Sequence, residues 1–322
     1  MKNCAAMLVA AMAITSLNNA ARAENWPTRP VHVIVPITGG SAIDIVARAV
    51  SQRLEKKFGQ PFVVENRPGA GTTLGAAVVA RAPADGYTIL FDSAALTTTP
   101  TTVANLSYNV DKNFAAVAPV VETPLVLVTQ HAKYKSLADL VTRAKADAAP
   151  ITYGTNGYGS AAHFTTEKLL LSAGFKGQAV PYRGTPEALA EVMAGRLGFY
   201  FSPLTAAQAL IKAGKVDALA VTSTRRSSVL PDVPTTVEAG YTGSDFDFWV
   251  GIFAPAHTPE PIVASLAKGV DAIKASEDFK KAMAAIGGDP MASMTPAQFQ
   301  AYVGEELKRN KAVAKAAGIE PK

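Results

Sequence analysis

The sequence predicts an α/β protein with two doubly wound domains, and three observations support this prediction. Short β-branched strands alternate with amphipathic helices from Val31 onward, as in parallel sheets. A strand, a loop of glycine and hydroxyl residues and a helix follow one another twice, beginning at Val31 and at Ile151. Between these units, residues 119–129 form a long extended run, which we expect to carry the chain from one domain to the other.

The first unit starts with the buried strand Val31–Val35 and the loop Thr38-Gly39-Gly40-Ser41. Apolar residues then recur at helical spacing from Ile43 to Leu54, which predicts a helix that ends near Phe58. The unpaired N–H groups at the start of such a helix suit a carboxylate or a phosphate. The order β-α-β-α-β is completed by a strand at 62–65, a helix at 74–81 and a strand at 87–91 that ends at Asp92-Ser93-Ala94.

The second unit repeats this arrangement. A strand at 151–153 leads into a loop from Gly154 to Ser160 and a helix from Ala161 to about Leu171. Ligands of parallel sheets bind beyond the carboxyl ends of the strands, where both loops and Ser93 would lie. We therefore expect a ligand in a cleft between the two domains.

The remaining segments extend both domains. Strands are expected at 178–182, 199–201 and 218–222, and helices at 137–146, 186–194 and 204–213. A second crossover at 222–234, a strand within 246–255 and helices at 259–274, 277–286 and 296–317 complete the chain. The predicted boundaries are residues 24–123 and 229–322 for domain 1 and 124–228 for domain 2, joined by two crossover strands.

Residues 1–23 resemble a secretory signal peptide. Lys2 precedes an apolar run at 5–14, and Ala21-Arg22-Ala23 is an A-x-A site with predicted cleavage after Ala23. The run is about half the length that a membrane span needs, and an ordinary buried helix is the alternative. Cleavage would remove Cys4, the only cysteine, so the exported chain would have no disulfide and no thiol chemistry.

The charge balance argues against nucleic acid as a partner. The chain carries 31 Lys and Arg residues against 26 Asp and Glu residues, a net charge of +5. The basic residues are spread out, whereas nucleic-acid binding needs a clustered basic stripe. A mild positive balance is compatible with anionic small molecules.

Several groups of residues follow one another in a specific order from about residue 26 to residue 319. They are Trp26-Pro27-Thr28-Arg29-Pro30, Val64-Glu65-Asn66-Arg67-Pro68-Gly69-Ala70-Gly71, Ala84-Asp85-Gly86-Tyr87-Thr88, Pro181-Tyr182-Arg183-Gly184, Leu219-Ala220-Val221-Thr222-Ser223, Leu230-Pro231-Asp232-Val233-Pro234-Thr235, Trp249 and Phe253-Ala254-Pro255. Together they resemble the Bug family of periplasmic solute-binding proteins, which serve tripartite tricarboxylate transporters.

The resemblance implies a periplasmic binding protein of type II, a two-domain Venus flytrap that binds a small carboxylate without catalysis or a cofactor. Its partner would be the membrane permease of a tripartite tricarboxylate transporter or, alternatively, a sensor kinase, and we expect a monomer. The family's ligand loops map onto 37–44, Ser93 and 155–163. The expected ligand-binding residues are Thr38, Gly40, Ser41, Ala42, Asp44, Ser93, Asn156, Gly157, Ser160, Ala161, His163 and Ser202.

The sequence departs from the family pattern at two places. Gly39-Gly40-Ser41 stands where proline-glycine-glycine is frequent, which adds a hydroxyl near the ligand. Ser202 follows Phe201 where the family often has an aspartate. Loss of that carboxylate argues against a ligand with a cationic amine and leaves a simple organic acid or an aromatic carboxylate.

Some of these residues allow a second interpretation. Ser160 and His163 are the one plausible nucleophile and base of an exported hydrolase, but no G-x-S-x-G elbow surrounds Ser160. Asp44 would contact the ligand through water or, as the favoured interpretation, stabilise the start of its helix through the helix dipole. Arg183 would pair with a second ligand carboxylate or lie in solvent, and Trp249 would line the cleft or belong to the core.

Two further patterns carry little weight. The glycines from Gly69 to Gly75 resemble a dinucleotide loop, but a tight turn that opens a helix explains them better. The four histidines are scattered without carboxylates or cysteines at ligand spacing, so no metal site is predicted.

Overall fold

The computed structural model describes residues 26–69, 72–155, 160–182 and 184–321. The expected signal peptide with its cleavage site, and the candidate residues Asn156, Gly157 and Arg183, lie outside the described residues. The strands are β1 (Val31–Val35), β2 (Phe62–Asn66), β3 (Thr88–Ser93), β4 (Phe114–Gln130), β5 (Ile151–Thr155), β6 (Gly177–Pro181), β7 (Phe199–Pro203), β8 (Val216–Val221), β9 (Asp247–Pro255) and β10 (Asp289–Pro290).

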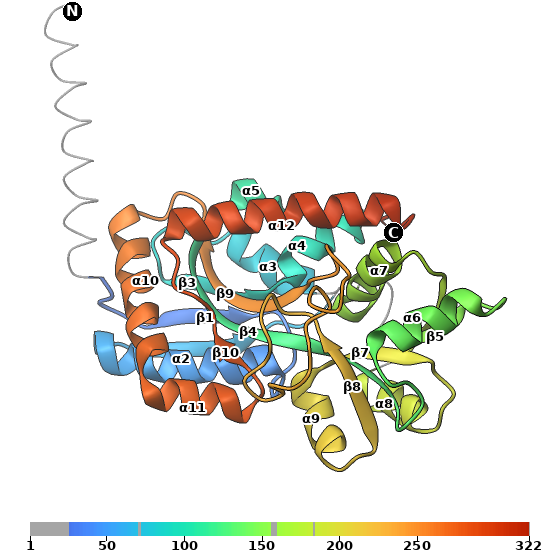
Figure 1. Ribbon diagram of the computed structural model, residues 1–322. Coiled ribbons are helices and arrows are strands. Elements are labelled where there is room, and N and C mark those ends of the chain that lie inside the picture. The colour runs from blue at the N-terminus through green and yellow to red at the C-terminus, as the bar shows by residue number, and fades with distance from the viewer. Residues whose placement is uncertain (1–25, 70–71, 156–159, 183, 322) are drawn as a thin grey trace, which may run out of the picture.

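Helices pack on both faces of these strands (Figure 1). They are α2 (Ala42–Phe58), α3 (Thr73–Ala80), α4 (Ala95–Thr98), η2 (Thr99–Thr101), α5 (Val110–Asn113), α6 (Leu137–Ala146), α7 (Ala161–Ala173), α8 (Thr185–Met193), α9 (Leu204–Lys212), α10 (Glu260–Ala275), α11 (Glu277–Ala285) and α12 (Pro296–Ala316). The predicted α/β class is confirmed. No helix in the described ranges is long and apolar enough to cross a membrane.

Strand β4 joins two groups of strands. The sheet order is β2-β1-β3-β9-β4-β7-β5-β6, and β8 and β10 also pair with β4. Residues 114–124 of β4 pair with β9, whereas residues from Leu125 onward pair with β7 and β8. The long strand is therefore the first crossover, as expected from its extended run, although it begins five residues earlier than predicted.

The second crossing lies beside the first. Thr222 follows β8, and its N–H donates to the carbonyl of Leu125, while its hydroxyl accepts the Leu125 N–H at 3.1 Å. The carbonyl of Thr222 then accepts the N–H of Phe246, directly before β9. The guanidinium of Arg225 also pairs with the carboxylate of Glu122 on β4. The two crossings are thus hydrogen-bonded to each other where the strand groups meet.

The apolar stripe predicted for the first helix is confirmed. Ile43, Val46, Val50 and Leu54 of α2 are buried against β1, β3 and α10. The helix ends at Gly59, which adopts φ +70 and donates its N–H to Glu55. This cap explains the end of the helix, because glycine accepts the left-handed conformation without strain. The core thereby fixes the start of α2 relative to the carboxyl end of β1.

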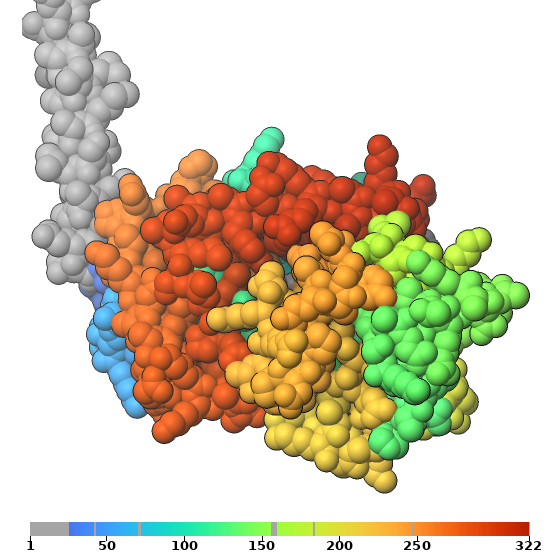
Figure 2. All heavy atoms as spheres, in the orientation of Figure 1, coloured from blue at the N-terminus to red at the C-terminus, as the bar shows by residue number. Residues whose placement is uncertain are grey.

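Helix α12 connects the two strand groups on one face of the molecule (Figures 1 and 2). It packs on β4 and α4 and also contacts α7. The Asn310 amide donates to the Thr97 hydroxyl at 3.0 Å, and Arg309 lies 3.7 Å from the carboxylate of Asp245. The ammonium of Lys168 on α7 binds the Asp245 carbonyl. Trp249 is fully buried against Phe299 of α12, so its core interpretation holds.

Candidate ligand-binding site

The carboxyl ends of the two parallel strand groups face each other. Strands β1, β2 and β3 are parallel, and β3 runs antiparallel to β9, which runs antiparallel to β4. Strand β7 is antiparallel to β4 and parallel to β5, which is parallel to β6. The first group is therefore parallel to β4, and the second group is antiparallel to it. Both groups end where β4 passes from β9 to β7.

The pairing register places two candidate residues at this junction. Ser93 pairs with Val250, which pairs with Val121 of β4. Ser202 pairs with Val126 of β4. Val121 and Val126 are five residues apart, which is about 17 Å along a strand at about 3.3 Å per residue. The loops after β1, β3, β5 and β7 consequently approach one region from opposite sides.

The first loop ends in a capped helix. Ser41 is the N-cap of α2, and its hydroxyl oxygen accepts the Asp44 N–H at 3.2 Å. Gly40 turns the chain with φ +80 and donates its N–H to the Asp44 carboxylate at 2.9 Å. Thr38 and Gly40 are exposed, Ser41 is half-buried, and α2 begins at Ala42.

Asp44 holds this loop together. The residue is only 2% exposed, and its carboxylate accepts hydrogen bonds from Arg48 Nε at 3.0 Å and from Asn66 Nδ2 at 2.9 Å besides that of Gly40. The same Asn66 amide donates to the Ile37 carbonyl. Although burial opposes ionisation, these hydrogen bonds and the Arg48 charge keep the pKa of Asp44 below its usual value. The carboxylate is committed to protein donors.

The roles of Asn66 and Arg48 in this loop were not predicted from the sequence. Asn66, at the end of β2, reaches across to the loop after β1 and binds Ile37 and Asp44. The spacing of Asp44 and Arg48, four residues apart on a helix, is a signal that could have identified this pair. Asn66, at the end of the neighbouring strand β2, carries no comparable sequence signal, because its role depends on the register of β1 and β2.

Ser93 closes strand β3. It is buried, its N–H donates to Asp92 Oδ1 at 2.7 Å, and its hydroxyl oxygen accepts the Ala95 N–H at 3.2 Å. Asp92 is fully buried, and its Oδ2 has no hydrogen-bond partner among the described residues. Burial raises the pKa of Asp92 to about 7 despite the Ser93 N–H. A titratable carboxyl therefore lies directly behind a candidate ligand residue.

The third loop leads into α7 without a carboxylate. Ser160 is the N-cap, and its hydroxyl oxygen accepts the His163 N–H at 3.3 Å. The same oxygen lies 3.0 Å from the Thr155 hydroxyl at the end of β5. The first turn of α7 contains no acidic residue. Ser160 and Ala161 are half-buried at the start of this helix.

His163 points into the protein. The residue is 2% exposed, its ring stacks on Tyr153 with centroids 6.4 Å apart, and its Nε2 lies 3.7 Å from Glu167. The Tyr153 hydroxyl donates to the same Glu167 carboxylate at 2.5 Å. Burial lowers the pKa of His163 to about 4, so the ring is neutral at pH 7. The hydrogen bond that joins His163 to Ser160 comes from its backbone, which is the geometry of a helix cap.

The hydroxyls of these serines differ in what they can offer a ligand. Ser41, Ser93 and Ser160 accept backbone N–H groups, which leaves their protons for a ligand acceptor or a neighbouring hydroxyl. Ser202 is buried and donates its own proton to the Pro203 carbonyl at 3.0 Å. Ser41, Ser93 and Ser160 can therefore donate a proton to a ligand carboxylate, whereas Ser202 can offer a ligand only the lone pairs of its hydroxyl oxygen.

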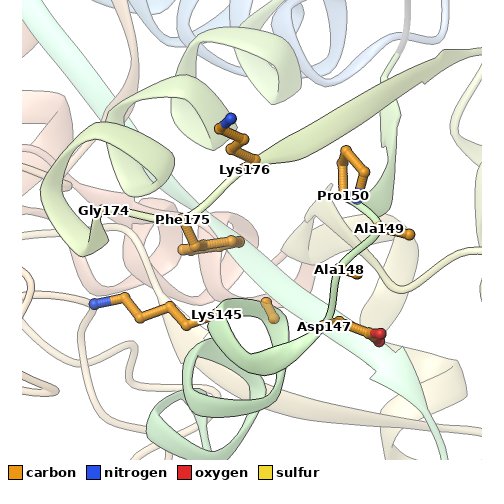
Figure 3. A pocket seen from close by; sticks show the side chains of 9 residues that line it. Lys145, Asp147, Ala148, Ala149, Pro150, Gly174, Phe175 and Lys176 are labelled. Atoms are coloured by element: carbon orange, nitrogen blue, oxygen red, sulfur yellow. The ribbon is translucent and has the colours of Figure 1, made fainter.

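Three hollows lined by described residues contain none of the candidate residues. The one in Figure 3 lies at the outer ends of α6 and α7, has a volume of about 310 Å³ and is lined by Lys145, Asp147, Phe175 and Lys176 among others. It lies between the carboxyl ends of two helices, where carbonyl groups concentrate. Within the described part of the chain, no group of three His, Cys, Asp or Glu residues could hold a metal ion.

Comparisons with known proteins place the chain. Residues 46–319 match the family model described as "Tripartite tricarboxylate transporter family receptor". Protein BugT of Bordetella pertussis (strain Tohama I) is 33% identical over 303 residues, covering 93% of both chains.

Solved structures give the same result. Rpa4515 of R. palustris, solved with adipate, has 34% identity and a TM-score of 0.79, covering 92% of this chain and 100% of its own. The periplasmic binding protein BugD has 32% identity and a TM-score of 0.76, covering 92% of this chain and 100% of its own. MatC of Rhodopseudomonas palustris, with bound malate, has 31% identity and a TM-score of 0.71, covering 89% of this chain and 99% of its own.

These similarities confirm the two-domain fold of periplasmic binding proteins and the predicted Bug resemblance. The family is one of solute receptors, in agreement with the expectation of a non-catalytic protein. The chain belongs to the tripartite tricarboxylate transporter receptor family.

Proposed function

We propose that this protein is a periplasmic receptor that captures a small carboxylate between its two domains and delivers it to a tripartite tricarboxylate transporter. The observation that carries the proposal is the convergence of two parallel strand groups on one junction, with capped serines on both sides. The relatives solved with adipate and with malate support a carboxylate as the ligand. A sensor kinase remains the alternative partner.

The binding mode follows from the hydroxyl protons. Ser93 accepts the Ala95 N–H and Ser160 accepts the His163 N–H, so each hydroxyl retains a proton to donate. The first N–H groups of α7 and α2 add partial positive charge. We propose that Asp44 does not contact the ligand directly, because its carboxylate accepts from Gly40, Arg48 and Asn66. We propose that Ser41, Ser93 and Ser160 provide the hydroxyl donors of the site, and that Asn156 and Gly157 of the loop after β5 also contact the ligand.

The domain boundaries remain predictions, and we propose one refinement. The segment from 223 to 246 is tied to the second strand group, because Val221 donates to the Pro234 carbonyl and Ser172 donates to the Thr242 carbonyl. We therefore place the return to domain 1 at about residue 246 rather than at 229. Export by a signal peptide cleaved after Ala23, and a monomeric state, are part of the same proposal.

The first experiment compares malate with aspartate. The protein is unfolded, freed of bound solutes, refolded and heated with malate, adipate, benzoate or aspartate, because a ligand at 100 times its Kd stabilises by about 2.7 kcal/mol. We expect at least one of the acids without an amine to raise the Tm. The absence of any shift with the three acids at millimolar concentration would contradict the proposal.

Aspartate has the carbon skeleton of malate with an ammonium group in place of the hydroxyl. Because Ser202 replaces an aspartate that is frequent in the family, we expect aspartate to stabilise the protein less than malate does. The variant Ser202→Asp should reduce this difference. An equal response to malate and aspartate in the wild type would show that residue 202 does not select against the amine.

A further inference from the structure

The carboxyl of Asp92 occupies an unusual position for an acidic residue. It lies in the sheet one residue before Ser93, is fully buried, and pairs across the strands with Gly251 of β9. Directly opposed residues of antiparallel strands share a face of the sheet. Gly251 faces the ring of Phe299, so Asp92 points into the aromatic core beneath α12.

The surroundings of Asp92 supply little to stabilise a negative charge. Its Oδ1 accepts the Ser93 N–H, and its Oδ2 has no partner among the described residues. An ionised carboxylate with one free oxygen in such a core is costly, and protonation removes the cost. The pKa of about 7 is set by burial and by the Ser93 N–H. The geometry therefore favours a proton on Asp92.

The groups that face Asp92 do not provide a counter-charge. Tyr108, from the segment before α5, has its pKa raised by burial and by the Asp92 charge, and its hydroxyl has no partner among the described residues. Gly251 and its neighbour Trp249 on β9 are uncharged, and α3 contains no ionisable residue. On α12, burial raises the pKa of the Glu306 carboxyl, and the charges of Arg309 and Lys168 oppose this shift.

We propose that Asp92 is a ligand-linked proton site, which is protonated when a carboxylate binds beside Ser93. This inference depends on the proposed carboxylate-binding function. A ligand carboxylate at the Ser93 hydroxyl would lie one residue from Asp92, on the other side of the strand end. Two negative charges at that spacing, one of them fully buried, repel each other, so the ligand and the proton bind together. Capture of the anion would then be accompanied by uptake of a proton.

The test measures affinity against pH. Malate and adipate are titrated calorimetrically into refolded protein from pH 6.5 to 9, where both ligands are ionised and His163, with a pKa of about 4, does not titrate. We expect the Kd to rise with pH, approaching tenfold per pH unit well above pH 7 if only the protonated form binds. In Asp92→Asn, which keeps an oxygen for the Ser93 N–H, the Kd should be constant over this range.

A matched control and a second measurement make the test decisive. Glu306→Gln removes another buried carboxyl and should keep the pH dependence of the wild type. Titration of the wild type at pH 8 in phosphate and in Tris gives the protons taken up per ligand, which we expect to approach one, and this measurement does not require the variant to fold.

Three results would overturn the inference. Binding of equal strength from pH 6.5 to 9 without proton uptake would refute it and leave the proposed function intact. A pH dependence that persists in Asp92→Asn would assign the proton to another group. The absence of carboxylate binding at every pH would refute the proposed function, and the inference with it.

Discussion

The starts of α2 and α7 have the same serine cap but differ in charge. At α2, the carboxylate of Asp44 lies in the first turn and takes the N–H of Gly40. At α7, no acidic residue is present in the first turn, and Ser160 is bonded to the neutral Thr155 hydroxyl and the His163 N–H. The positive end of α2 is therefore partly neutralised by the protein, whereas that of α7 is available to a ligand anion.

Helix α6 shows what the α2 arrangement does by itself. Ser136 caps α6, Asp139 three residues later accepts the N–H of Lys135, and Arg143 pairs with Asp139. This repeats Ser41, Gly40, Asp44 and Arg48 in kind and spacing, on a helix that follows the far end of β4. By analogy with Asp139, we interpret Asp44 as a carboxylate that caps its helix. We therefore expect α7 to hold the ligand carboxylate and α2 to provide the rigid wall that faces it.

The largest expected effect concerns the stability contributed by Asp92, the buried acidic residue at the end of β3. Because the folded-state pKa of Asp92 is raised from 3.8 to about 7, its protonated form favours folding, and this contribution is lost as pH rises from about 4 to about 7. The loss is about 4 kcal/mol. Asp92→Asn should have little effect on stability at pH 4 and be more stable than the wild type by that amount at pH 8. Urea unfolding at both pH values measures it, and equal stability at pH 8 would refute it.

His163, in the first turn of α7, should make the stability change with pH in the opposite direction. The pKa of His163 is lowered from 6.5 to about 4, so its contribution is present above pH 6.5 and is lost as pH falls towards 4. The loss is about 3 kcal/mol. We expect His163→Gln to remove this acid destabilisation in urea unfolding between pH 7 and 4. Since the Asp92 slope is opposed to it, the wild type should vary less with pH than either variant, and a steeper wild type would contradict both assignments.

The third prediction compares the two capping carboxylates. Asp44→Ala removes the acceptor of three hydrogen bonds in a buried loop, and we expect it to lower the free energy of unfolding by about 2–3 kcal/mol. Asp139→Ala removes the same arrangement from an exposed helix start and should cost clearly less. Chemical unfolding of both variants at pH 7 measures the difference. Equal losses would show that burial and Asn66 add nothing at α2.

The sequence predicted the elements better than the contacts between them. Helix α6 has the predicted bounds 137–146, because a serine cap and helical periodicity are local signals. The short elements α4, α5 and β10 were not predicted, since two to four residues carry no period. The candidate loops follow from strand order, whereas the burial of Asp92 depends on its pairing with Gly251 and on packing under α12. Such cross-strand relations cannot be read from one sequence without the register.

The smallest expected effect tests which helix holds the ligand. Ser160→Ala should weaken carboxylate binding by about 1–2 kcal/mol, because a charge-assisted hydrogen bond is lost at a helix start without a competing anion. Ser41→Ala should weaken it by less, since Asp44 already occupies the N–H of Gly40 there. Each substitution removes an N-cap and should lower the free energy of unfolding by about 1 kcal/mol. A difference in affinity between the two variants would therefore not reflect a difference in their stability. Calorimetry with malate and adipate measures both affinities, and a larger loss for Ser41→Ala would reverse the assignment of anchor and wall.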